Sequence, residues 1–227
     1  MSRPSHPVSL VQPLLPHRVE PGEVERDGHV GCFAVTTIKT PFTGNPEADA
    51  LLTENPLALL CGMLLDQQVP MEWAFASPLR LQQRLGVPLD AAHIAEVPLE
   101  ELERHFTGPP ALHRYPSSMA KRTQQLCHHL VDHYDGKAEA IWTGVSTGEE
   151  LFDRLRALPG FGGEKAKIFQ ALLAKRFGIT PPGWEGPAQP FSDATHRSIA
   201  DVDSPDALVE VRAFKKMMKA QGKGKDG

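Results

Sequence analysis

Helix-start signals recur along the sequence from Asn45 onward, and they limit the possible folds more than any other feature. At each of them, a side chain that can cap a helix N-terminus stands directly before a helix-forming stretch. In four of them a proline follows the cap at the first helical position, where its missing N–H costs nothing. The signals are Asn45-Pro46-Glu47, Asn55-Pro56, Ser77-Pro78, Ser117-Ser118, Thr147-Gly148-Glu149-Glu150 and Ser204-Pro205-Asp206. The sequence therefore predicts an all-α fold.

The apolar residues follow helical rather than strand periodicity. Residues 57–65 are apolar nearly all round, which is typical of a central buried helix. Residues 119–133 form an amphipathic pattern, whose predicted inward side chains are Met119, Leu126, Leu130 and Val131. A chain of 227 residues with 41% hydrophobic side chains can bury one core or two small ones. We expect several packed helices arranged as two small lobes.

Two regions differ in organisation. Residues 1–41 carry scattered prolines and, apart from a strand-like stretch at Phe33–Ile38, no periodicity. We expect a poorly ordered N-terminal extension there, and whether it belongs to the native protein stays open. Residues 42–227 are expected to form the helical domain.

The compartment is predicted from what the sequence lacks. The 3 cysteines are far apart and form no CxxC pair, which favours a reducing environment over disulfides or structural zinc. No apolar run approaches the roughly 20 residues that span a bilayer, and the N-terminus does not show the order of a signal peptide. We therefore expect a cytoplasmic protein with no membrane partner.

A glycine-rich turn between two helical patterns is the strongest functional signal. Residues 151–158 predict one helix, 159–163 a turn and 164–173 a second helix, so a helix-hairpin-helix is expected at about 150–175. Gly160 and Gly162 can take positive φ, and without Cβ atoms they let backbone N–H groups reach a phosphate at the second helix N-terminus. The alternative is a plain turn between helices with a glycine C-cap.

The residues around this turn support the same interpretation. Phe161 is expected to pack the two helices together, and Gly163 completes the turn. Lys165 and Lys167 follow closely enough to add charge-assisted contacts to phosphate. The turn therefore predicts binding to the backbone of double-stranded DNA.

Residues from about Phe42 to the C-terminus resemble the HhH-GPD superfamily of base-excision DNA glycosylases, the endonuclease III and AlkA-like proteins. Besides the hairpin, Leu64-Leu65-Asp66-Gln67-Gln68-Val69-Pro70 looks like the family's early helix that ends in a glutamine. In the family this glutamine fills the space left by an extruded base, which implies that Gln68 is the wedge. The alternative for Gln68 is a surface residue at a helix end.

The resemblance also implies a catalytic carboxylate. A Gly/Pro-rich loop at 181–190 precedes Phe191-Ser192-Asp193-Ala194-Thr195-His196, and the family's catalytic aspartate follows such a loop. Asp193 is the implied residue, with a helix N-cap as its alternative role. Because this loop is longer than in the family, Asp201 is the competing carboxylate. Glu164 stands where the family's lyases carry a Schiff-base lysine, which argues against a lyase step.

No cofactor or metal is expected. The four-cysteine iron–sulfur motif of endonuclease III is missing from the sequence, so no cluster should form. His129 and His133 share a helical face, but no HExxH motif or third acidic ligand accompanies them.

Together these features predict a monomeric, monofunctional DNA glycosylase that hydrolyses the N-glycosidic bond of a damaged base. A non-catalytic helix-hairpin-helix DNA-binding protein and a helical interaction module without a DNA role are the alternatives. The net charge of −4 counts against DNA binding, because phosphates require a positive surface. However, basic residues crowd the C-terminus, at Arg212, Lys215, Lys216, Lys219, Lys223 and Lys225.

Overall fold

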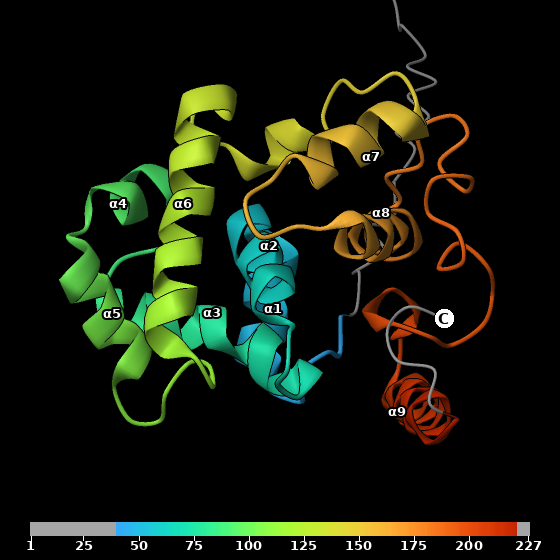
Figure 1. Cartoon of the computed structure of the whole chain (residues 1–227), viewed down its shortest axis with the longest axis horizontal. Helices are drawn as coiled ribbons and strands as arrows, with labels where there is room; N and C mark the ends of the chain where they lie inside the picture. The colour runs from blue at the N-terminus through green and yellow to red at the C-terminus, as the bar shows by residue number, and fades with distance from the viewer. Residues whose placement is uncertain (1–39, 222–227) are drawn as a thin grey trace, which may run out of the picture. The chain divides into compact units, whose positions relative to one another are not determined.

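In the computed structural model, residues 40–221 are described, and every regular element in this range is helical, as predicted (Figure 1). The predicted N-terminal extension, including the strand-like Phe33–Ile38, lies outside the described residues except for Thr40 and Pro41. The elements are α1 (Pro46–Glu54), α2 (Pro56–Leu65), α3 (Met71–Leu85), α4 (Ala91–Glu96), α5 (Leu99–Thr107), α6 (Pro116–Tyr134), the 3-10 helix η1 (Ala138–Ile141), α7 (Gly148–Arg156), α8 (Gly163–Phe177), the 3-10 helix η2 (Ile199–Asp201) and α9 (Pro205–Ala220).

Four of the predicted helix starts are confirmed by their capping hydrogen bonds. The Asn45 side chain accepts from the backbone N–H groups of Glu47 and Ala48 at the start of α1. The side chains of Asn55, Thr147 and Ser204 cap α2, α7 and α9 in the same way. These caps act within three residues of the helix start, which is why the sequence alone predicts them.

The other two predicted starts differ from the structure. Ser77 and Pro78 lie inside α3 rather than at its N-terminus. The Ser77 hydroxyl donates to the carbonyls of Trp73 (2.8 Å) and Leu112 (2.7 Å), so it is engaged within the helix and with the segment before α6. Packing of α3 on α2 thus outweighs the helix-breaking tendency of Pro78. Helix α6 begins at Pro116, after a residue that makes no side-chain cap.

Helix α2 is the centre of the fold, as its apolar composition predicts. All nine residues from Leu57 to Leu65 are buried, and α2 contacts α1, α3, α6 and η1. It packs closely on α3, where a Cβ added at Gly62 would lie 2.6 Å from the Cδ1 atom of Phe75. A glycine at this position lets the aromatic ring pack directly on the α2 backbone.

Two groups of helices pack around α2. Helices α4 and α5 contact α6, whereas α7 and η2 contact α8, and α9 contacts η2. Figure 1 shows α4, α5 and α6 on one side of α2 and α7, α8 and α9 on the other. All the described residues belong to one compact unit.

The predicted inward face of α6 is correct except at one position. Met119, Leu126 and Leu130 are buried, but Val131 is 38% exposed. With about 3.6 residues per turn, Val131 points roughly 100° away from Leu130. Thr123 and Cys127 complete the buried face instead.

Within residues 40–221, no single helix combines the length and the apolar character needed to cross a membrane. Helices α1 and α2 reach that threshold only when they are taken together, and they are bent by 114° relative to each other.

Candidate functional site

The turn between α7 and α8 depends on Gly160. Its φ of +81° lies in the left-handed region, and an added Cβ would stand 2.4 Å from Cδ1 of Leu64 at the end of α2. Both the backbone conformation and the space therefore require glycine here. Phe161 is buried and meets the ring of Phe169 edge-on at 5.9 Å, which anchors the turn to α8.

Gly162 differs from the prediction, because its φ is −96° and not positive. It is the N-cap of α8 and makes no side-chain capping bond. An added Cβ at Gly162 or at Gly163 would meet nothing within 4 Å. These two glycines are therefore not needed for the backbone conformation or for internal packing, and they leave the start of α8 open to a ligand.

The two lysines near the start of α8, Lys165 and Lys167, lie in different surroundings. The Lys165 ammonium donates to the carbonyl oxygens of Met63 and, at 2.8 Å, of Leu64. It thus satisfies carbonyls in the last turn of α2, which lack partners within that helix. Lys167, which follows Lys165 by two residues in α8, is half-buried. Phosphate binding by Lys165 and Lys167 stays a prediction.

Gln68 lies in the turn between α2 and α3 and has a φ of +58°, which is uncommon for a residue with a side chain. Hydrogen bonds from two directions support this turn. The Tyr115 hydroxyl donates to Oε1 of Gln68 (3.4 Å), and Nε2 of His113 donates to the carbonyl of Gln67 (2.9 Å). The backbone is therefore held in a costly conformation at the residue predicted to act as the wedge.

His113 can support the turn because it is buried and neutral. Its Nδ1 accepts from the backbone N–H of Tyr115 at 3.0 Å, so the ring proton is on Nε2. Burial is the largest influence on the imidazole and lowers the pKa of His113. Sequence reasoning missed this residue, because nothing in its local pattern indicates which carbonyl it reaches.

A cavity of about 960 Å³ brings the two predicted motifs together. Gln68, Gly160 and Gly162 all line it, although the first is far from the other two in the sequence. Its wall also contains charged residues from α3, α8, α9 and the segment before η2, namely Glu72, Glu164, Lys165, Arg197, Arg212, Lys215 and Lys219. Apolar side chains such as Ile168, Phe191 and Phe214 lie between them.

Asp193, the predicted catalytic residue, is not among the residues that line this cavity. Its carboxylate accepts from the Arg197 guanidinium (2.8 Å) and from the backbone N–H of Thr195 (2.9 Å). The hydrogen bond from Arg197 is the main reason that the pKa of Asp193 is lowered. Asp193 is thus ionised and half-buried. Its partner Arg197 lines the cavity, whereas Asp193 itself does not.

Asp201, the competing carboxylate, is 6% exposed and makes structural contacts with both oxygens. One oxygen pairs with the Lys175 ammonium of α8 at 2.6 Å. The other accepts from the backbone N–H groups of Arg197 and Ser198, each at 2.9 Å, and completes a capping box with Ser198. These bonds attach η2 to α8.

Three carboxylates that were not predicted as site residues do line the cavity: Asp66, Glu72 and Glu164. Glu72 forms an ion pair with Arg212 of α9. Asp66 is the C-cap of α2, only two residues before Gln68 in the segment that carries the resemblance. Its position in that segment was the signal by which the sequence could have indicated Asp66 as a site residue.

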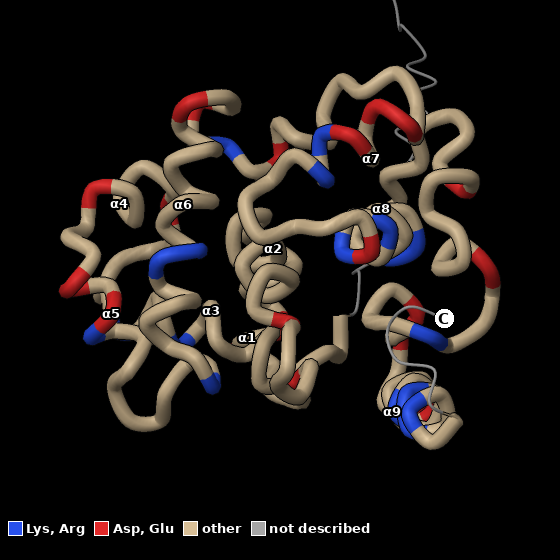
Figure 2. The backbone as a smooth tube through the Cα atoms, viewed as in Figure 1, with Lys and Arg blue, Asp and Glu red and all other residues tan. Residues whose placement is uncertain are grey.

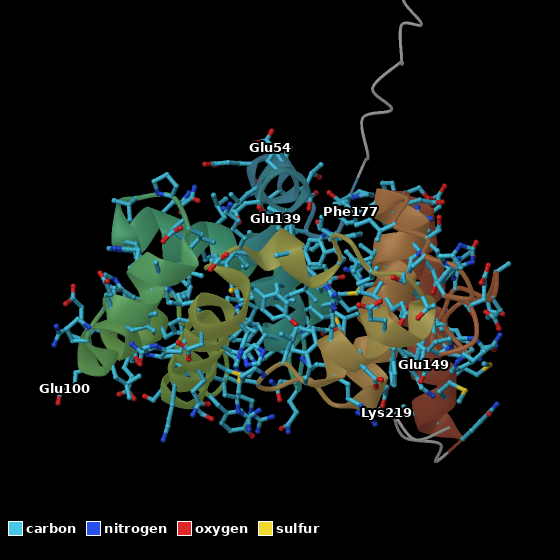
Figure 3. All side chains as sticks on the ribbon, turned by 90° about the horizontal axis from the view of Figure 1, so that it is seen from above. Glu54, Glu100, Glu139, Glu149, Phe177 and Lys219 are labelled. Carbon is cyan, nitrogen blue, oxygen red and sulfur yellow. The ribbon has the colours of Figure 1, made fainter. Side chains whose placement is uncertain are left out.

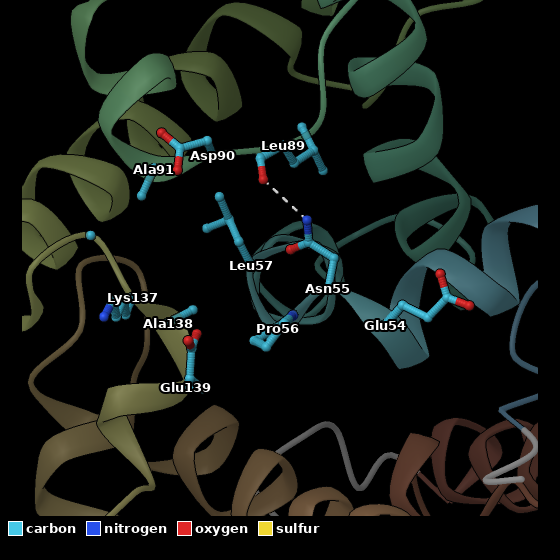
Figure 4. Close-up of a pocket in the computed structure, with 11 residues that line it drawn as sticks. Glu54, Asn55, Pro56, Leu57, Leu89, Asp90, Ala91, Lys137, Ala138 and Glu139 are labelled. Carbon is cyan, nitrogen blue, oxygen red and sulfur yellow. Dashed lines mark hydrogen bonds between the residues drawn. The ribbon is translucent and has the colours of Figure 1, made fainter.

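The smaller cavity and the histidine pair give less support for a functional site. A smaller cavity of about 240 Å³ lies where the Asn55 side chain donates to the carbonyl of Leu89, and it contains none of the predicted site residues (Figure 4). The rings of His129 and His133 are 4.4 Å apart. In the described part of the chain, no group of three or more His, Cys, Asp or Glu side chains could hold a metal ion.

The large cavity therefore combines an open helix N-terminus, a strained glutamine turn, carboxylates and guanidinium groups. Such a mixture can hold a ligand that carries both an anion and a flat apolar part. Comparisons with protein-family models, curated proteins and solved structures gave no match to this chain.

The two glycines of the hairpin are expected to respond differently to substitution. Gly160→Ala should lower the free energy of unfolding by about 2–4 kcal/mol, because it adds left-handed strain and an overpacked contact with Leu64. Gly162→Ala, the matched control, should cost roughly 1 kcal/mol or less, because its φ is negative and its surroundings are open. Urea unfolding measures both values, and equal losses would contradict this assignment.

Stability should depend on pH through His113. Its folded pKa lies below the ordinary value of 6.5, so between these two values the unfolded chain binds more protons. The contribution of His113 is therefore fully present above pH 6.5 and decreases as the pH falls. His113→Gln keeps a side-chain N–H donor without titrating, so its unfolding free energy should decrease less between pH 7.5 and pH 5.

The exposed His128, replaced by glutamine, serves as the control for this experiment. If His113→Gln and His128→Gln show the same pH dependence as the wild type, the assigned role of His113 is wrong.

Substitution of Asp201 and of Asp193 is expected to lower the free energy of unfolding by different amounts. Asp201→Asn leaves the Lys175 ammonium without its charged partner in a buried setting and should cost about 3 kcal/mol. Asp193→Asn removes a half-exposed pair with Arg197 and should cost about 1 kcal/mol or less. Thermal unfolding of both variants tests this, and a larger loss for Asp193→Asn would refute it.

Proposed function

We propose that this protein binds double-stranded DNA through the α7–α8 hairpin and hydrolyses the N-glycosidic bond of a damaged base held in the large cavity. The observation that carries the proposal is that Gln68 and the hairpin glycines line the same cavity. Enzymes that act on a base must extrude it from the duplex into a pocket. A volume of about 960 Å³ is at the upper end of the range for small-molecule pockets and is sufficient for a nucleotide.

The start of α8 supplies the grip on the backbone. Helix α8 has 15 residues, and its dipole favours an anion at its N-terminus. Gly162 and Gly163 leave open space where a side chain would otherwise block a phosphate oxygen. These features support a phosphate contact at this turn.

The Gln68 turn supplies the wedge. Positive φ at Gln68 and the hydrogen bonds from Tyr115 and His113 hold the turn at the cavity wall. Gln68 is exposed, and its backbone is already positioned, so the side chain can enter the base stack without the entropy cost of ordering the turn at that moment.

The chemistry requires a carboxylate beside C1′ of the extruded nucleotide. When the C1′–N bond breaks, its electron pair leaves with the base and positive charge develops on the sugar. A carboxylate stabilises this charge and takes the proton of the water that adds to C1′. Asp193 is the candidate from sequence, and Asp66 and Glu164 are the candidates from the cavity wall.

Hydrolysis is favoured over a lyase reaction. A lyase needs a neutral amine that attacks C1′, whereas the Lys165 amine donates to two backbone carbonyls of α2. Glu164, which precedes it, supplies a carboxylate and not an amine. The protein therefore needs no cofactor for the proposed reaction.

A second candidate is a DNA-binding protein without catalysis. The observation that favours it is that the Asp193 carboxylate is bound by Arg197 and does not line the cavity. In that case the hairpin would bind DNA in the same way, but no bond would be cleaved.

The test is a panel of duplexes that carry uracil, an alkylated purine, an oxidised pyrimidine or a mismatch. We expect the wild type to release the base from at least one of them, leaving an abasic site that is detected by alkaline cleavage. Asp66→Asn, Glu164→Gln and Asp193→Asn are assayed on that substrate, and the variant that loses at least about a hundredfold in rate identifies the carboxylate.

Asp153→Asn on the exposed face of α7 is the control, because it removes a carboxylate that pairs with Arg156 on the protein surface. Duplex binding without any base release would support the non-catalytic candidate. If the wild type neither binds duplex nor releases a base, both DNA proposals are overturned and the helical interaction module remains.

A further inference from the structure

Helix α9 carries four cations along one side. Arg212, Lys215, Lys216 and Lys219 are spaced at i, i+3, i+4 and i+7, so they share a face of the helix. We call these four residues the α9 basic stripe. Figure 2 shows the cluster of Lys and Arg positions on α9.

The residues of the stripe are exposed, and they lie beside the face by which α9 packs on η2. Ala207 and Val211 are buried, and α9 contacts η2. Lys215, Lys216 and Lys219 are exposed, and none of the ion pairs formed within residues 40–221 involves them. Three positive charges are thus presented together to an outside partner.

Two contacts fix the position of the stripe beside the cavity. Arg212 pairs with Glu72 in the first turn of α3, and the Arg197 guanidinium lies 5.4 Å from the ring centroid of Phe214. As a result Lys215 and Lys219 line the same cavity as Gly160 and Gly162.

Basic residues outnumber acidic ones at the cavity wall, where Lys165, Arg197, Arg212, Lys215 and Lys219 lie with Asp66, Glu72 and Glu164. The acidic Glu100 of α5 lies far from Lys219 in the view from above (Figure 3). A net charge of −4 therefore coexists with a local positive surface, and that surface lies at the cavity.

We propose that the α9 basic stripe is a second phosphate-binding element, which binds the backbone of double-stranded DNA next to the nucleotide that enters the cavity. The proposal rests on the proposed function. The open start of α8 and the lysines of α9 border one cavity, so a strand that places a nucleotide in it would have phosphates within reach of both. Such contacts position the strand without reading its sequence.

The two-anchor arrangement has a physical purpose. Extruding a base costs a few kcal/mol of stacking and pairing, and bound phosphates next to the extruded nucleotide can offset that cost. Lysine is suited to this task because its flexible ammonium neutralises phosphate as a point charge.

The experiment compares Lys215→Ala/Lys219→Ala with Arg104→Ala/Lys137→Ala in duplex binding over a range of salt concentrations. Both double variants remove two exposed positive charges, but Arg104 and Lys137 lie on α5 and before η1, outside the cavity wall. Alanine in α9 preserves helix propensity, and circular dichroism checks the fold. The full chain and an undamaged duplex are used.

We expect the slope of log K against log[salt] to decrease by about two for the α9 variant, with affinity roughly tenfold or more weaker at low salt. The control should keep the slope of the wild type. If the wild type binds duplex and the α9 variant has an unchanged slope, the stripe does not contact phosphates. This result overturns the inference about α9 but not the proposed function.

If the wild type does not bind duplex even at low salt, the proposed function fails and this inference fails with it. Vesicles that contain phosphatidylserine form a parallel arm. Lysine-dependent binding to vesicles without duplex binding would assign the stripe to a membrane surface and overturn the proposal.

Discussion

The contact between the hairpin turn and the end of α2 is the constraint on which the rest of the site depends. Because α2 is buried along its length, the carbonyls of its last turn need partners inside the protein. Lys165 supplies them to Met63 and Leu64, and Gly160 allows the turn to approach Leu64. The Gln68 turn follows this end of α2 directly, so its position and that of the hairpin are set by one contact.

Burial explains how a strained turn persists at the cavity wall. The positive φ of Gln68 costs free energy, and the neighbouring structure offsets it through the neutral imidazole of His113 and the hydroxyl of Tyr115. The same burial that keeps the imidazole uncharged lowers its pKa. On the proposed function, the backbone of the wedge residue is thus positioned before DNA binds, and the entropy of ordering the turn is not lost at the moment of extrusion.

The two aspartates show why a sequence motif does not by itself assign a catalytic group. Asp193 and Asp201 both follow the Gly/Pro-rich loop, yet folding gives them different partners. Asp201 is tied to Lys175 and to the backbone at the start of η2, whereas Asp193 is bound by Arg197. Carboxylates that do line the cavity come from the end of α2, the start of α3 and the start of α8, which no local pattern brings together.

The sequence by itself determined the helical fold, four of the six predicted helix starts and the buried α2, because capping and amphipathic patterns act over only a few residues. Asn45, Thr147 and Ser204 cap their helices as predicted. Tertiary structure decided that Pro78 continues α3, since packing on α2 outweighs local propensity. It also decided which charged groups border the cavity, because that wall joins segments distant in sequence whose contacts form only when the helices pack.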